Sequence, residues 1–105
     1  MEERFDPKKT SRIDYGIIES LVNEQAKVLD LGCGEGNLLK LLIDSKNILG
    51  RGVEISSEGV HRAMEKGLSV VQGNIDEGLS DYSDKSFDWV ILSQTLQVIY
   101  EPRMV

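Results

Sequence analysis

Short apolar runs alternate with amphipathic segments along this chain of 105 residues. The apolar runs predict buried strands, at about 27–31, 49–55, 68–72 and 87–92. Apolar positions with helical spacing predict helices, at about 11–23, 36–45 and 57–66. The regular exchange of strand and helix indicates an α/β fold, in which a Rossmann-like parallel sheet with right-handed crossovers carries flanking helices.

The first predicted helix begins the domain. Ser11 with Asp14 is similar to a capping box, and an apolar helical face follows it, formed by Ile17, Ile18, Leu21 and Val22. Residues 1–10 are polar and contain a proline, so we expect a loose lead-in there and a single domain over residues 11–105. Gly67 is the expected stop of the third helix.

The fourth predicted strand is apolar on both faces. Alternation places Phe87, Trp89 and Ile91 on one face, and Val90 and Leu92 on the other. Such a strand belongs in the interior of a sheet. Left at an edge it would expose unpaired backbone groups, so pairing with a second copy through this edge is expected in that case.

The most informative segment joins the first strand to the second helix. It reads Val-Leu-Asp-Leu-Gly-Cys-Gly-Glu-Gly over residues 28–36, and Glu54 follows its last glycine by 18 positions. Glycines without a Cβ allow a sharp turn and let a ligand lie against the backbone. An acid about 20 residues further along a βαβ unit can accept from both hydroxyls of a ribose. The pair therefore predicts a nucleoside pocket.

Other interpretations of this segment stay open. The glycines could serve the turn alone, and Glu54 could be a solvated acid at a strand end. A dinucleotide site fits less well, because its fingerprint is G-x-G-x-x-G/A, whereas the glycines here run G-x-G-x-G.

Composition narrows the classes of function. Twelve basic and eighteen acidic residues give a net charge of −6, which argues against a nucleic-acid binder. Cys33 is the only cysteine, so no intramolecular disulfide can form, and a cytoplasmic location is the default expectation. No apolar stretch approaches the roughly 20 residues that span a bilayer, so we expect no membrane insertion.

The glycine segment resembles the first motif of class I S-adenosylmethionine-dependent methyltransferases. A narrower resemblance rests on four segments, which are Arg-x-Asp-Tyr at 12–15, Gly-Val-Glu-Ile at 52–55, Gln-Gly-Asn-Ile-Asp-Glu-Gly-Leu at 72–79, and Phe-Asp at 87–88 through Ser-Gln-Thr-Leu-Gln at 93–97. Together these segments look like the methionine biosynthesis protein MetW family. The resemblance implies strand order 3-2-1-4 and S-adenosylmethionine as the cofactor. Because class I methyltransferases usually carry seven strands, it also implies that the chain is truncated after strand four.

The resemblance further implies roles for individual residues at a crevice between strands one and four. Asp30 would lie by the amino acid tail of the cofactor, and Glu54 would bind the ribose. The other implied cofactor-binding residues are Gly32, Gly34 and Gly36, which admit the cofactor, Cys33 beneath it, Ile55 next to Glu54, Asn74 and Ile75 at the adenine, and Ser93, with Gln94, near the methyl group.

Several candidate residues have simpler interpretations. Asn74 could only form a turn, and Asp76 could take its place if the loop register shifts by two. His61 is expected to face solvent, and Cys33 lacks an activating base for a nucleophile. The acids around residues 76–84 lack the spacing of a metal loop, so no metal site is expected. Methyl transfer needs positioning more than acid–base help, so the catalytic residues stay unknown.

Two functions from different classes follow from the resemblance. The first is an S-adenosylmethionine-binding, methyltransferase-like protein associated with methionine biosynthesis, whose methyl acceptor the sequence does not identify. The second is a non-catalytic regulatory module that binds a homoserine O-acyltransferase and modulates its activity.

Overall fold

The computed structural model describes residues 15–76, 87–94 and 97–100. A helical stretch covers residues 15–21. The elements that follow are β1 (Lys27–Leu31), α2 (Asn37–Lys46), β2 (Leu49–Glu54), α3 (Ser57–Glu65), β3 (Val70–Gln72), β4 (Trp89–Leu92) and β5 (Gln97–Tyr100). β1 has the predicted bounds, and the bounds of the other predicted strands, α2 and α3 differ from the prediction by at most two residues, which is the usual uncertainty of element ends.

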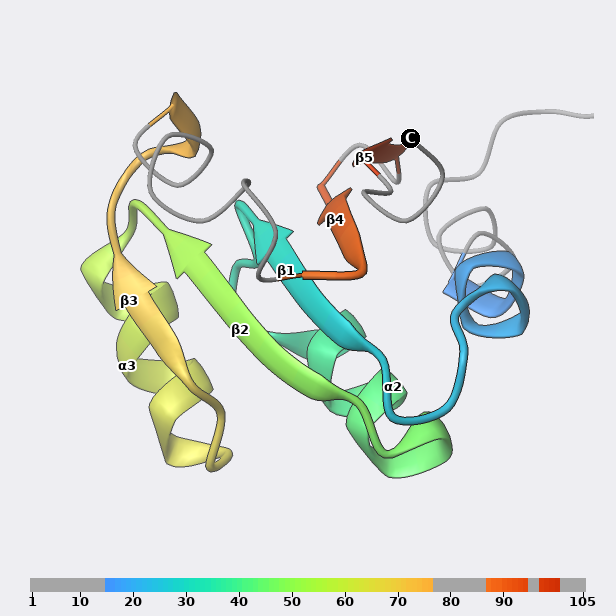
Figure 1. Cartoon of the computed structure of the whole chain (residues 1–105). Coiled ribbons are helices and arrows are strands. Elements are labelled where there is room, and N and C mark those ends of the chain that lie inside the picture. The colour runs from blue at the N-terminus through green and yellow to red at the C-terminus, as the bar shows by residue number, and fades with distance from the viewer. Residues whose placement is uncertain (1–14, 77–86, 95–96, 101–105) are drawn as a thin grey trace, which may run out of the picture.

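The strands form one sheet in the order β3-β2-β1-β4-β5. β1 pairs in parallel with β2 and β4, and β2 pairs in parallel with β3, so the predicted order 3-2-1-4 is confirmed. The carboxyl ends of these strands lie along the upper edge of the sheet in Figure 1. After β1 the chain places β2 and β3 on one side of it, and then returns to place β4 on the other side. This reversal of direction is where an open α/β sheet leaves a crevice for ligands.

The edge next to β4 differs from the expectation. β5 pairs antiparallel with β4, with Leu92 opposite Gln97 and Ile91 opposite Val98. The interior position predicted for β4 is therefore confirmed, whereas the expectation that the chain stops after strand four is wrong, because the chain adds one more strand after β4. β4 is paired on both sides, as its two apolar faces require, so its edge is not open to a second copy of the chain.

Each face of the sheet has its own apolar core. Val28, Trp89 and Ile91 pack with the buried leucines of α2, and α2 and α3 lie together behind the strands in Figure 1. The opposite face forms a second core, made of Leu29, Leu31, Val53 and Val90. Phe87 packs with this second core and not with Trp89 as predicted, because it precedes β4 and does not follow the alternation of the strand.

The helix over residues 15–21 buries less of its apolar face than predicted. Ile18 and Val22 are buried, whereas Ile17 and Leu21 are 52% and 55% exposed. The predicted cap at Ser11 and the lead-in over 1–10 lie outside the described residues. Among the described helices, none combines the length and the apolar character needed to cross a membrane.

Candidate functional site

The glycine loop, residues 32–36, leaves the end of β1 in a tightly bonded turn. The backbone N–H groups of Gly32 and Cys33 both donate to the Val53 carbonyl, at 2.7 and 3.1 Å. The three loop glycines have φ values of +72°, +61° and +88°, in the left-handed region that side chains disfavour. These hydrogen bonds attach the loop to the end of β2. The loop joins strand β1 to helix α2, as the sequence predicted.

Glu54 at the end of β2 holds the other side of the loop. Its Oε1 accepts a hydrogen bond from the Gly34 N–H at 2.8 Å, and its Oε2 accepts one from the Ser56 N–H at 3.0 Å. The residue is only 5% exposed, so the alternative of a solvated strand-end acid is wrong. Each carboxylate oxygen has capacity for a second donor, so Glu54 can bind the loop and a ligand together.

A hollow of about 350 Å³ opens at the carboxyl ends of the strands, and we call it the crevice hollow. Its described lining residues come from the ends of β1 to β4, and they are Gly32, Glu54, Ile55, Gly73, Asn74, Ile75, Asp76 and Gln94. Five of the predicted cofactor-binding residues are in this set, together with Gln94, which was expected at the crevice. Sequence analysis gave Gly73 no role and considered Asp76 only as a substitute for Asn74.

Asp30 and Ser93 lie together next to Gly32, and neither is among the described lining residues of the crevice hollow. Asp30 Oδ1 accepts from the Ser93 N–H at 3.1 Å, and Ser93 Oγ donates to the Gly32 carbonyl at 3.4 Å. Asp30 is 1% exposed, and its Oδ2 has no hydrogen-bond partner among the described residues. Burial raises the pKa of Asp30 to about 7, against the lowering effect of Ser93, and the charge of Glu54 raises it further.

Tyr15 is a residue to which sequence analysis assigned no role. Burial raises the pKa of its phenol, and the charge of Asp30 raises it further. The helix over residues 15–21 thus places the protonated hydroxyl of Tyr15 close enough to Asp30 for the two groups to interact electrostatically. In the sequence, Tyr15 ends the Arg-x-Asp-Tyr segment of the family resemblance and lies just before the apolar face of the first predicted helix.

The side chain of Cys33, within the glycine loop, packs against Gly52 of β2 and does not line the crevice hollow. It is 6% exposed, and its Sγ donates to the Gly34 carbonyl at 3.6 Å. A Cβ at Gly52 would lie 2.6 Å from this sulfur, so the thiol fills the space that the glycine leaves. Burial raises the pKa of Cys33 to about 12, and the charges of Asp30 and Glu54 contribute.

We therefore expect the Cys33 thiol to be unreactive in the folded protein. A thiolate is the nucleophilic form, and at pH 8 almost none is present when the pKa is about 12. A disulfide reagent such as 5,5′-dithiobis(2-nitrobenzoate) should modify native chain at a small fraction of the rate measured in urea. Equal rates in the two conditions would show that the sulfur is accessible and activated.

The remaining candidates lie away from the crevice hollow. Gly34 lines a smaller hollow of about 220 Å³ beside α3, and Gly36 faces the side chain of Leu68. His61 pairs with Glu65 at 3.3 Å on the exposed face of α3, as predicted. Within the described ranges no three His, Cys, Asp or Glu residues come together as metal ligands, and the acids beyond Asp76 are outside those ranges.

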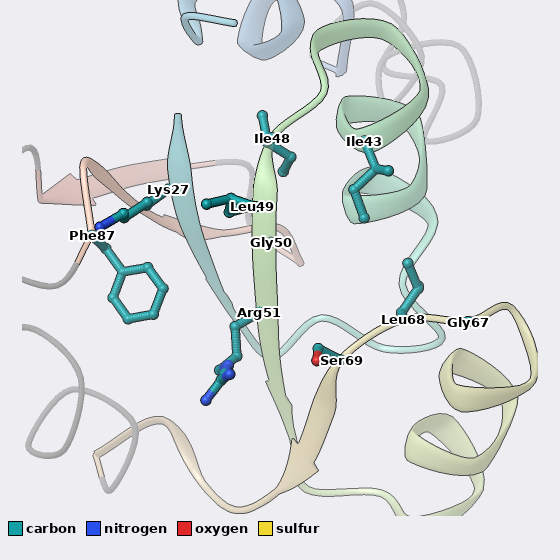
Figure 2. A pocket seen from close by; sticks show the side chains of 10 residues that line it. All are labelled: Lys27, Ile43, Ile48, Leu49, Gly50, Arg51, Gly67, Leu68, Ser69 and Phe87. Carbon is teal, nitrogen blue, oxygen red and sulfur yellow. The ribbon is translucent and has the colours of Figure 1, made fainter. Parts of the chain in front are cut away.

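A larger hollow of about 710 Å³ lies at the opposite edge of the sheet, near the amino ends of β1, β2 and β3. Figure 2 shows Lys27 and Arg51 on one side of β2, and Ile43 and Leu68 on the other. Neither the glycine loop nor Glu54 contributes to its described lining. Because parallel α/β sheets bind ligands at the carboxyl ends of their strands, the smaller crevice hollow is the better candidate.

Comparison with solved structures defines the class of fold. The chain is 21% identical to the S-adenosylmethionine-dependent methyltransferase from Thiobacillus denitrificans, solved with S-adenosyl-L-homocysteine; the TM-score is 0.61, over 88% of this chain and 38% of that one. The plantazolicin methyltransferase BamL, solved with S-adenosylhomocysteine and a triazolic desmethylPZN analogue, is 26% identical, with a TM-score of 0.65 over 82% and 36% of the two chains. The fold is that of class I S-adenosylmethionine-dependent methyltransferases.

Comparison of sequences defines the family. Residues 12–105 match the family described as "Methionine biosynthesis protein MetW", and the chain belongs to this family. The bifunctional methionine biosynthesis protein MetXA/MetW of Rhodopirellula baltica is 33% identical over 98 aligned residues, covering 86% of this chain and 16% of that protein. The chain therefore spans about a sixth of the length of this relative.

Proposed function

We propose that the chain binds S-adenosylmethionine and S-adenosylhomocysteine in the crevice hollow, as a methyltransferase-like protein of methionine biosynthesis. The observation that carries the proposal is the meeting of a buried carboxylate with apolar side chains at the carboxyl ends of the strands. Glu54 accepts from the ribose hydroxyls. Ile55 and Ile75, which are 67% and 39% exposed, cover the adenine, and Asn74 hydrogen-bonds its amino group.

The charges around the hollow support a cationic ligand. Glu54 and Asp76 line it, and no lysine or arginine is among its eight described lining residues. Asp30, which shares Ser93 as a hydrogen-bond partner with Gly32 of this lining, has a buried Oδ2 with no donor among the described residues. An ammonium group supplies donors to such an oxygen. S-adenosylmethionine carries both an ammonium and a sulfonium, so negative potential favours its binding.

The hydrogen bonds of the glycine loop argue against a dinucleotide. A dinucleotide site holds the pyrophosphate with free backbone N–H groups at the glycine turn. Here the N–H groups of Gly32 and Cys33 donate to a carbonyl of β2, and that of Gly34 donates to Glu54. Two buried carboxylates next to this loop would also repel a pyrophosphate.

Calorimetric titration tests the proposal directly. We expect S-adenosylhomocysteine and S-adenosylmethionine to bind at least about 30-fold more tightly than NAD⁺ or ATP, which corresponds to roughly 2 kcal/mol. NAD⁺ and ATP share the adenosine group but add phosphates, so they are matched control ligands. No binding of S-adenosylhomocysteine, or equal binding of NAD⁺, would overturn the cofactor assignment.

A second candidate function is regulation of a homoserine O-acyltransferase. It is supported by the relative from Rhodopirellula baltica, which joins MetXA and MetW in one bifunctional protein. A regulatory module would bind the cofactor without turnover, and would change the acyltransferase rate when added to that enzyme. Formation of S-adenosylhomocysteine from S-adenosylmethionine with a pool of acceptors, together with no complex at micromolar concentrations, would favour the methyltransferase instead.

A further inference from the structure

Helix α3 and the turn after it pack along the back of the glycine loop. Near the start of the helix, a Cβ at Gly59 would lie 3.3 Å from the Gly34 carbonyl oxygen and 3.1 Å from Glu54 Cγ. Past its end, a Cβ at Gly36 would collide with the side chain of Leu68. The loop is therefore fitted to α3 at both ends of the helix, and its shape depends on contacts outside the loop.

Lys66, at the carboxyl end of α3, makes the polar part of this contact. Its Nζ donates to the Glu35 carbonyl at 3.0 Å, to Glu35 Oε1 at 2.9 Å and to Asn37 Oδ1 at 3.0 Å. A lysine ammonium has three N–H donors, so these three acceptors use all of them. The end of a helix also carries partial negative charge that favours a cation.

The arrangement differs from an ordinary surface ion pair. The Lys66 side chain is 30% exposed, whereas that of Lys40, which pairs with Asp44 one turn away on α2, is 48% exposed. One of the Lys66 bonds reaches a backbone carbonyl inside the glycine loop. The hydrogen bond and charge of Lys66 also lower the pKa of Glu35.

We propose that Lys66 is a positioning residue for the cofactor site. It holds the Glu35 carbonyl, which lies two peptide units after the Gly34 N–H that donates to Glu54. Through this short stretch of the glycine loop it sets the Glu54 carboxylate for the ribose. This role rests on the proposed function for its link to the cofactor. The contact of Lys66 with the glycine loop does not depend on the proposed function, because it rests only on the hydrogen bonds of Lys66.

Lys66→Met is expected to weaken binding of S-adenosylhomocysteine about tenfold, or roughly 1.4 kcal/mol. Methionine keeps the apolar part of the side chain and removes the three donors, so the loop has to be ordered by the ligand. Calorimetry gives the affinity, and thermal melting checks that the fold is kept. Lys40→Met, which removes the Lys40–Asp44 pair on α2, should leave the affinity unchanged.

Two conservative variants separate positioning from a general loss of stability. Lys66→Arg keeps the charge, but a planar guanidinium cannot match three acceptors set for an ammonium, so it should restore only part of the affinity. Glu35→Gln keeps the backbone carbonyl and one side-chain acceptor, so its affinity should stay within about twofold of the wild type. A uniform loss that follows the melting temperature would contradict a positioning role.

Hydrogen exchange gives a readout that needs no ligand. The Gly34 and Gly36 amides should exchange about tenfold faster in Lys66→Met, while the amides of β1 keep their wild-type rates. Unchanged exchange and affinity would overturn the role of Lys66 and leave the proposed function intact. A wild-type chain that binds no S-adenosylhomocysteine would overturn the proposed function, and faster loop exchange would then still support the hold of Lys66 on the loop.

Discussion

Glu54→Gln is expected to weaken binding of S-adenosylhomocysteine about 100-fold, or roughly 2.7 kcal/mol. Both oxygens of Glu54 accept from backbone N–H groups, of Gly34 at 2.8 Å and of Ser56 at 3.0 Å. Glutamine has one acceptor oxygen and one NH₂ donor, so in either orientation one of these N–H groups faces another donor. A hydrogen bond to a charged group contributes roughly 1.5–3 kcal/mol, and the ribose loses its charged acceptor as well.

The same substitution should also lower the melting temperature, because the glycine loop loses a contact with β2. Affinity is therefore measured well below the melting temperature of the variant. Glu58→Gln is the matched control, since Glu58 lies four positions further along, is 74% exposed and pairs only with Arg62 among the described residues. If Glu54→Gln lowers the melting temperature but keeps the affinity within threefold of the wild type, Glu54 stabilises the loop and does not bind the ligand.

Most of the fold was predictable because its pattern is local. Val28, Leu29 and Leu31 indicate a buried strand from their own sequence alone. Gly67, with φ of +84°, follows the end of α3 where the sequence indicated a stop. What could not be predicted depends on distant pairing. β5 forms because residues 97–100 return to β4, and nothing in their short apolar pattern specifies that partner. Ile17 and Leu21 satisfy helical spacing, but the width of the buried stripe depends on the sheet beneath it.

In the candidate site, too, some features follow from local sequence and others depend on contacts between distant residues. The glycines and Glu54 are recognised by spacing along the chain, and the structure brings Glu54 into the crevice hollow with Ile55 and Asn74. The partners of Glu54 could not be predicted, since the approach of the Gly34 N–H depends on how the loop lies against β2. Lys66 was missed for the same reason: it is 31 positions from Glu35, and only the packing of α3 brings them together.

Asp30 makes cofactor binding dependent on pH if the amino acid tail lies next to it. Its folded-state pKa of about 7 is above the ordinary value of 3.8, because burial disfavours the charged form. A ligand ammonium favours the ionised carboxylate, so binding releases a proton when Asp30 begins protonated. Affinity for S-adenosylhomocysteine should therefore be about tenfold lower at pH 6 than at pH 8, and lower still at pH 5.

Calorimetry in two buffers of different ionisation enthalpy counts the released protons. At pH 6.5 we expect between about half a proton and one proton per bound ligand, and close to none at pH 8.5. Asp44→Asn, at an acid 59% exposed on α2, should keep the wild-type profile. Asp30→Asn should bind about 30-fold more weakly at pH 8, because it loses the charge that pairs with the ammonium, and should show no such dependence near neutral pH.

The stability of Asp30→Asn should change in the opposite direction from its affinity. Since the folded-state pKa is raised, the contribution of Asp30 to stability is fully present below about pH 3.8 and is lost as the pH rises through about 7. At pH 8 the wild type holds a buried charge with one oxygen unpaired among the described residues, and asparagine removes that charge while keeping an acceptor for the Ser93 N–H. A gain of about 1 kcal/mol should raise the melting temperature at pH 8 by roughly 4–8 °C, with a smaller gain at pH 5. Two results would contradict this role: a lowered melting temperature of Asp30→Asn at pH 8, and a wild-type affinity that does not change from pH 6 to 8. Together they would mean that Asp30 stabilises the packing of β1 and β4 and does not bind the ammonium of the ligand.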